Sequence, residues 1–242
     1  MKLSIIIPVL NSHEVLRRQL LHFDKIGIPE DTEVIILDDG SNPKLEAEPR
    51  SWLTIHDTGD TREWTWAVAR NTGAKLAKGE YFLMTDLDHI ITREIIDQIR
   101  NFTGDHIRFN REFAVIDEEG NFTQDLEVLR QYGLDKDRDV HLNPHRNQFA
   151  MHKDLYKKMG GFREDRIGKP YPQREDGDFS ARWNELYNAG EINDFDDIVG
   201  YNNREILYMF PNGKYCGDVD FNPFNLFHKL TRKTNKNPYY EK

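Results

Sequence analysis

Residues 69–88, ARNTGAKLAKGEYFLMTDLD, run from a helical pattern through a glycine into an apolar segment and an acidic turn. The apolar spacing predicts a helix over residues 63–78, which Gly79 ends. Residues 80–85 form a largely apolar run that predicts a buried strand, and Asp86-Leu87-Asp88 follows it directly. Helix, buried strand and polar turn in this order indicate one unit of an α/β sheet.

The residues before this stretch repeat the same alternation. LSIIIPV at 3–9 and EVIIL at 33–37 predict buried parallel strands, and residues 52–56 predict a third. Helices are expected over residues 12–26, capped by Ser12, and over residues 92–101, capped by Thr92. We therefore expect an α/β fold with a Rossmann-like mixed sheet, mostly parallel, flanked by helices on both faces.

The second half of the chain is less regular. The pattern predicts a hairpin around residues 113–122, strands at 148–152 and 205–210, and helices at 153–159 and 175–188. No linker-like segment divides the sequence, so we expect one domain over residues 1–242.

Composition excludes several classes of protein. The net charge of −9 disfavours a main role in nucleic-acid binding, although residues 229–236, KLTRKTNK, are locally basic. A single cysteine excludes an intramolecular disulfide. The apolar run at residues 3–10 is too short for a transmembrane segment and lacks the features of a signal peptide, which predicts a cytoplasmic protein.

Two acidic motifs follow predicted strands. Asp38-Asp39-Gly40-Ser41 is either a tight turn or a set of acceptors for a nucleoside at the carboxyl edge of the sheet. Asp86 and Asp88 form either a solvated acidic loop or a pair that shares a hard cation, Mn²⁺ or Mg²⁺.

Two further features are candidates for the same chemistry. Glu175-Asp176 opens a predicted helix, where acidic residues either stabilise the helix end or supply a general base, with Asp178 as a competitor. An imidazole often completes a carboxylate metal site, and His228 is the candidate here. Its alternatives are the other histidines His89, His145 and His152.

Five short motifs in this order resemble family-two glycosyltransferases of the GT-A fold. They are SIIIPVLN at 4–11, VIILDDGS at 34–41, the stretch at 69–88, GGFRED at 160–165 and RED at 174–176. The resemblance implies a metal-dependent glycosyltransferase that moves a sugar from a nucleotide-sugar, expected to be a UDP-sugar, to an acceptor hydroxyl. Residues 1–100 would be the nucleotide-binding half, and residues 101–242 the acceptor half with a C-terminal tail.

The resemblance also assigns roles by position. Nucleotide-binding roles go to Pro8, Asp38, Asp39, Asp57, Arg70 and Asp86. Asp86 and Asp88 match the metal-binding pair, with Asp88 as the direct ligand. Asp176, with Glu175 beside it, matches the catalytic base.

Residues 160–183 also resemble the GGF…ED segment of galactosyltransferases and polypeptide N-acetylgalactosaminyltransferases. In those enzymes a histidine before a basic, proline-containing stretch closes the metal site, which favours His228. Residues 169–174, KPYPQR, replace the glycines and tryptophan expected there, so the donor sugar does not carry over.

These features favour transfer with inversion, and two alternatives stay open. One is a retaining transferase on the same scaffold. The other is a nucleotidyltransferase or nucleotide-sugar binding module, which the lack of a glycine-rich basic loop after the first strand disfavours. The acceptor is expected to be a glycan, a protein or a small molecule, and a nucleic acid is disfavoured by the acidic charge.

Overall fold

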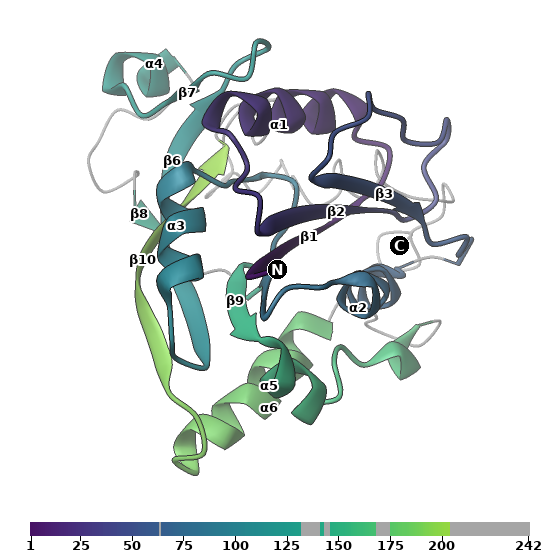
Figure 1. Ribbon diagram of the computed structural model, residues 1–242, viewed down its shortest axis with the longest axis vertical. Helices are drawn as coiled ribbons and strands as arrows, with labels where there is room; N and C mark the ends of the chain where they lie inside the picture. The colour runs from purple at the N-terminus through teal and green to yellow at the C-terminus, as the bar shows by residue number, and fades with distance from the viewer. Residues whose placement is uncertain (63, 132–140, 143–145, 168–174, 204–242) are drawn as a thin grey trace, which may run out of the picture.

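The fold is built around one twisted sheet with helices on both faces (Figure 1). The structure is a computed structural model, and it describes residues 1–62, 64–131, 141–142, 146–167 and 175–203. The sheet runs in the order β3-β2-β1-β4-β9-β6-β10-β5, with β7 and β8 pairing on β6.

The N-terminal strands form a parallel block. They are β1 (Leu3–Val9), β2 (Thr32–Asp38), β3 (Leu53–Asp57) and β4 (Tyr81–Met84). The register pairs Ile6 of β1 with Ile35 of β2 and with Met84 of β4. Every residue of β1 and β2 is buried, because helices cover both faces, and this explains their continuous apolar sequences.

The remaining strands extend the sheet beyond β4. They are β5 (His89–Ile90), β6 (His106–Ile116), β7 (Phe122–Thr123), β8 (His141–Leu142), β9 (Phe149–His152) and β10 (Asp194–Asn203). Strand β9 runs antiparallel to both β4 and β6, whereas β10 runs parallel to β6. Along the path of the sheet, only β9 and β5 therefore oppose the common direction, which confirms the expected mixed, mostly parallel α/β fold.

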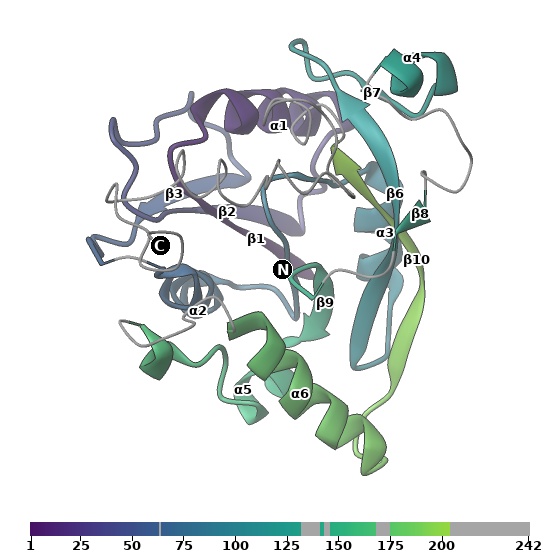
Figure 2. The same cartoon turned by 180° about the vertical axis from the view of Figure 1, so that it is seen from behind.

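Two groups of helices cover the two faces (Figures 1 and 2). Helices α1 (His13–Ile26) and α3 (Arg93–Asn101) pack on one face, through a core that includes Phe23 and Ile96. Helices α2 (Trp66–Leu76), α5 (Lys153–Lys158) and α6 (Glu175–Asn188) pack on the other, through residues that include Tyr156, Phe179 and Trp183. The short α4 (Leu126–Gln131) covers the far end of β6, and a 3₁₀ turn, η2 (Glu164–Arg166), precedes α6.

Several predicted elements are confirmed, among them β1, β2, β4, the hairpin of β6 and β7, α5 and α6. Thr92 caps α3 as expected, because its hydroxyl accepts a hydrogen bond from the Ile95 N–H at 3.4 Å. Ser12 does not cap α1 through its side chain, because its hydroxyl instead donates to the Leu10 carbonyl at 2.9 Å.

Two elements differ from expectation. Helix α2 begins at Trp66 rather than at residue 63, because Trp64 has φ +60, which a right-handed helix cannot contain. Strand β10 was not predicted, because its sequence DFDDIVGYNN is acidic and interrupted by a glycine. The strand forms nevertheless, because the Asp194 carboxylate contacts Arg108 at 2.6 Å and His106 at 3.1 Å on β6. The strand expected at residues 205–210 lies outside the described residues, and the single-domain division stays a prediction.

Candidate active site

Apart from Arg70, which lies on α2, the predicted nucleotide-binding residues lie at or just after the carboxyl ends of the four parallel strands. Each of the four strands ends in or next to one or two of the predicted residues. Together with the second aspartate of the metal pair, they are Pro8, Asp38, Asp39, Asp57, Asp86 and Asp88. Strands that run in parallel end at the same edge of a sheet, and open α/β sheets bind ligands at that edge. The fold therefore brings together residues that are up to 80 positions apart in the sequence.

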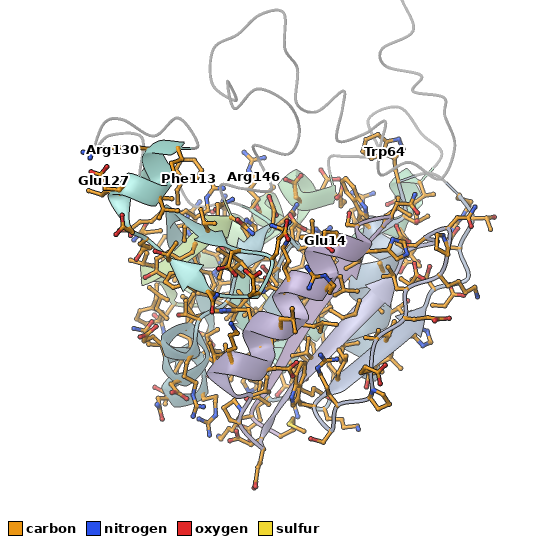
Figure 3. The ribbon with its side chains drawn as sticks, turned by 90° about the horizontal axis from the view of Figure 1, so that it is seen from above. Glu14, Trp64, Phe113, Glu127, Arg130 and Arg146 are labelled. Carbon is orange, nitrogen blue, oxygen red and sulfur yellow. The ribbon has the colours of Figure 1, made fainter. Side chains whose placement is uncertain are left out.

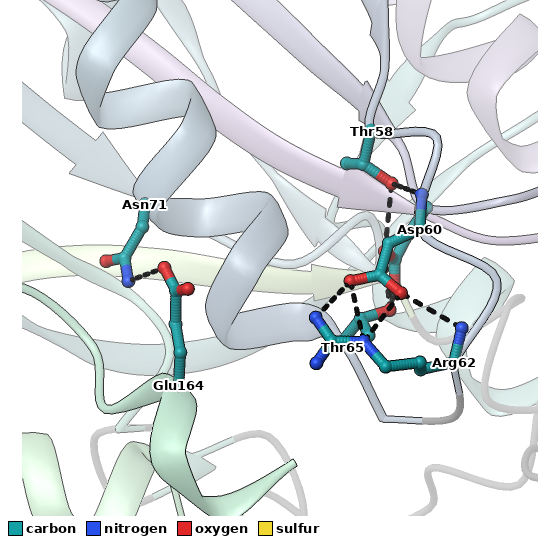
Figure 4. Close-up of polar contacts among 7 residues, drawn as sticks. Thr58, Asp60, Arg62, Thr65, Asn71 and Glu164 are labelled. Atoms are coloured by element: carbon teal, nitrogen blue, oxygen red, sulfur yellow. Dashed lines mark hydrogen bonds and ion pairs between the residues drawn. The ribbon is translucent and has the colours of Figure 1, made fainter.

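Asp38 and Asp39 are adjacent, but their carboxylates have different surroundings. The Asp38 carboxylate accepts backbone N–H bonds from Ser41 at 2.7 Å and Leu45 at 2.9 Å, so it shapes the loop after β2. The Asp39 carboxylate accepts hydrogen bonds from the hydroxyls of Thr65 at 2.7 Å and Thr58 at 3.5 Å. Asp39 is thus joined to the loop between β3 and α2, whose polar contacts Figure 4 shows.

Asp57 ends β3 at the exposed rim of this edge. Its carboxylate forms an ion pair with Lys44 and accepts the Gly59 N–H at 2.9 Å. The Lys44 ammonium and then the Gly59 N–H lower the pKa of Asp57, which keeps the carboxylate ionised.

Asp86, Asp88 and His89 form a candidate metal site after β4. One ligand atom from each lies within 4.8 Å of the others, which is a spacing that one cation can bridge. Burial lowers the pKa of the fully enclosed His89 imidazole to about 4, so this ring is neutral at pH 7, as a metal ligand must be. Two carboxylates and a neutral imidazole are a donor set that suits a divalent cation.

The other histidines proposed for this role are placed differently. His152 pairs with Tyr81 at the start of β4, which is the opposite edge of the sheet, and its ring accepts the Asp154 N–H at 3.3 Å. His145 and His228 lie outside the described residues, and the assignment of His228 as a ligand stays a prediction.

Arg70 connects the candidate metal site to the start of α6. Its side chain is 1% exposed, and it donates to Asp86 at 2.6 Å and to Glu175 at 3.5 Å. The guanidinium also lies 5.2 Å from the centre of the Phe162 ring. Burial alone would lower the pKa of Arg70, but the charges of Asp86 and Glu175 outweigh it, so the residue stays a cation.

Glu175 and Asp176 open α6 with contrasting environments. Glu175 is 4% exposed, and burial raises the pKa of its carboxyl to about 7, against the opposing charge of Arg70. Because the shorter contact of Arg70 is with Asp86, the guanidinium only partly compensates the negative charge of an ionised Glu175. Asp176 is partly exposed, with one carboxylate oxygen 2.6 Å from the Gly177 N–H. Of the two carboxylates, that of Asp176 is the more exposed.

Asn71, the residue after Arg70, anchors the GGF motif to α2. Its amide donates to the Phe162 carbonyl at 2.8 Å and to Glu164 at 2.7 Å, and the second contact is visible in Figure 4. Its carbonyl oxygen accepts from the Phe162 N–H at 2.9 Å and the Tyr156 hydroxyl at 2.7 Å. All of the hydrogen-bonding capacity of Asn71 is used, which fixes Phe162 beneath Arg70.

The comparison with protein families decides the class of this chain. The sequence profile of Glycosyl transferase family 2 matches residues 4–160, which is more than half of the chain. The chain belongs to this family. Both the expected class of enzyme, a glycosyltransferase, and the GT-A fold are thereby confirmed.

Solved structures share the fold at low sequence identity. TarS from S. aureus, residues 1–349, has a TM-score of 0.51 and 20% identity over 95% of this chain and 69% of that one. The same TarS fragment in complex with UDP-GlcNAc has a TM-score of 0.53 and 18% identity over 95% of this chain and 65% of that one. Its complex with UDP has a TM-score of 0.51 and 20% identity over 84% of this chain and 60% of that one. No curated protein matches the chain.

Some residues of this family-2 site were not predicted from the sequence. Thr65 and Asn71 act through hydrogen bonds to residues 26 to 93 positions away, which no local pattern reveals. The ARN motif at residues 69–71 placed Asn71 beside a candidate site residue, but it did not indicate the contacts of its amide. Within the described ranges, no helix combines the length and apolar character needed to cross a membrane. The cytoplasmic location stays a prediction.

Proposed function

We propose that this protein transfers a sugar from a UDP-sugar to an acceptor hydroxyl, with a divalent cation, Mn²⁺ or Mg²⁺, at Asp86, Asp88 and His89. The observation that carries this proposal is the link from that site through Arg70 to the Glu175-Asp176 pair. Asp86 of the candidate cation site and Glu175, the neighbour of Asp176, both contact this one buried arginine, which supports the proposal. The fold shared with TarS, whose structures include UDP and UDP-GlcNAc complexes, supports this donor class.

The residues of this chain have separate tasks in the proposed reaction. Asp39 and Asp57 hold the nucleoside, and Arg70 holds Asp86 in position through the 2.6 Å contact. A bound divalent cation would stabilise the negative charge on the leaving nucleoside diphosphate. Asp176 accepts the proton of the acceptor hydroxyl as its oxygen bonds to the anomeric carbon and the bond to the diphosphate breaks.

We propose transfer with inversion, and the different exposure of the two carboxyl groups supports this choice. A single displacement needs one accessible general base, and Asp176 is the more exposed of the pair, whereas Glu175 is buried against Arg70. A retaining enzyme remains the alternative, and the anomeric configuration of the product, read by NMR, separates the two. The acceptor in this proposal is a glycan, a protein or a small molecule.

The test is UDP binding with and without Mn²⁺, followed by transfer or hydrolysis of UDP-sugars. We expect Mn²⁺ and UDP together to raise the thermal midpoint, because a ligand that binds only the folded state stabilises it. Asp88→Ala should abolish the Mn²⁺-dependent part of this shift, and Asp154→Asn, an exposed change on α5, should preserve it. Full metal-dependent activity in Asp88→Ala would overturn the metal assignment, and a wild-type protein that binds no nucleoside diphosphate would overturn the proposed function.

A further inference from the structure

Trp64 has a backbone conformation that is unfavourable for its residue type. Its φ of +60 lies in the left-handed region, where a bulky L-residue is rare and glycine is the usual occupant. Such strain persists only where the surroundings impose it, and it concentrates at ligand-binding sites. Trp64 is also only partly buried, so the requirement to fill a core does not explain a tryptophan here.

The strained backbone is imposed by the contacts of the next residue and of the preceding loop. Thr65 is fully buried, and its hydroxyl bonds both carboxylate oxygens of Asp39, at 2.7 and 2.9 Å. Thr58 contacts the same carboxylate, and the Asp60 N–H donates to the Thr58 hydroxyl at 3.3 Å. Figure 4 shows this loop turning back from Thr58 to Thr65. Trp64 is therefore held one residue away from the contact with Asp39.

The Trp64 side chain forms an aromatic pair at the start of α2. Its indole packs edge to face on that of Trp66, with ring centres 5.4 Å apart at 79°. In Figure 3 Trp64 lies on the same side as Arg146. The Arg146 guanidinium approaches the start of α6, since a Cβ built on Gly177 would stand 3.1 Å from it. The edge-to-face contact uses the edge of only one of the two rings.

We infer that Trp64, braced by Trp66, stacks on the nucleobase of the donor. This inference rests on the proposed function, in which Asp39 contacts the nucleoside. A nucleoside bound at the ends of β2 and β3 would lie beside the loop that carries Trp64, and a flat heteroaromatic ring is the part of a nucleotide-sugar that an indole face binds best. The strained loop fixes the indole in advance, so less conformational freedom is lost when the base binds.

The experiment measures UDP affinity of the full chain with Mn²⁺ by calorimetry for the wild type and four variants. We expect Trp64→Ala and Trp64→Gly to weaken UDP binding by about tenfold. Trp64→Phe should stay close to the wild type, because it keeps an aromatic face. Trp52→Phe is the matched control, since Trp52 packs on Phe23 in the core beneath α1 and its replacement should not change UDP affinity.

Two readouts separate stacking from damage to the loop. Glycine relieves the left-handed strain and alanine does not, so Trp64→Gly should melt about 2–4 °C above Trp64→Ala while it binds UDP equally weakly. Inorganic pyrophosphate has no base, so its affinity should be the same in the wild type and in Trp64→Ala.

The other outcomes each overturn a stated claim. Unchanged UDP affinity in Trp64→Ala overturns base stacking and leaves the proposed function intact. An equal loss of affinity for pyrophosphate in Trp64→Ala means that the substitution damages the loop, and this result also overturns base stacking. A loss for UDP-GlcNAc without a loss for UDP assigns the indole to the sugar instead. A wild-type protein that binds no UDP overturns both this inference and the proposed function.

Discussion

Replacing Glu175 by glutamine should remove a part of the free energy of unfolding that falls as the pH rises. Burial raises the pKa of this carboxyl from its ordinary value of 4.5 to about 7, so the folded protein favours the neutral form. An acid with a raised pKa in the folded state contributes its full stability below pH 4.5 and loses that contribution as the pH rises through about 7. The rise in pKa corresponds to about 3 kcal/mol in the free energy of unfolding.

The measurement is urea denaturation at several pH values between 5 and 8 for the wild type and Glu175→Gln. The difference between the two proteins isolates the carboxyl, because every other titrating group is common to both. We expect the variant to gain about 2–3 kcal/mol on the wild type as the pH rises across this range. Glu185→Gln, an exposed change on the same helix, should follow the wild-type curve. Parallel curves for wild type and Glu175→Gln would refute the assigned pKa and the partial compensation by Arg70.

Three further outcomes follow from the site. Asp176→Asn should lower sugar transfer by about 10²- to 10⁴-fold and leave the UDP affinity within about twofold, and the same loss in Asp178→Asn would reassign the base. Asn71→Ala should lower the free energy of unfolding by about 2–4 kcal/mol, because a backbone N–H and a tyrosine hydroxyl lose their buried acceptor; an unchanged urea midpoint would contradict this. Gly161→Ala should be more destabilising than Gly160→Ala in thermal melts. Both positions have positive φ, but only at Gly161 would the new Cβ meet a side chain, Asn71 Oδ1 at 2.6 Å.

The N-terminal half of the fold was predictable because each of its signals is local. Continuous apolar runs at β1 and β2 report strands buried on both faces, and the parallel direction then places their polar ends at one edge. Strand β10 escaped prediction because partners distant in the sequence stabilise its charges. Asp194 pairs with residues of β6 that are 86 and 88 positions earlier, and no window of sequence contains that information.

Candidate residues for the site could be named from the sequence, but the contacts between them could not. The order of the motifs identified Arg70, Asp86 and Glu175 as candidates, but only the structure shows that one buried guanidinium contacts both carboxylates. The histidine of the candidate metal site shows the same limit. His89 follows Asp88 directly in the sequence, but only the structure shows that its ring lies within bridging distance of both carboxylates.

Helix α2 connects the candidate metal site to the loop before α6. Arg70 contacts Asp86, which follows β4, and the next residue, Asn71, contacts Phe162 in the loop before α6. Insertion of one residue would turn the following part of the helix by about 100° and break at least one of these attachments. A chimaera that joins the first hundred residues of this chain to the second half of a relative must therefore keep partners for both Arg70 and Asn71. Without them, Asp86 and the start of α6 will not align.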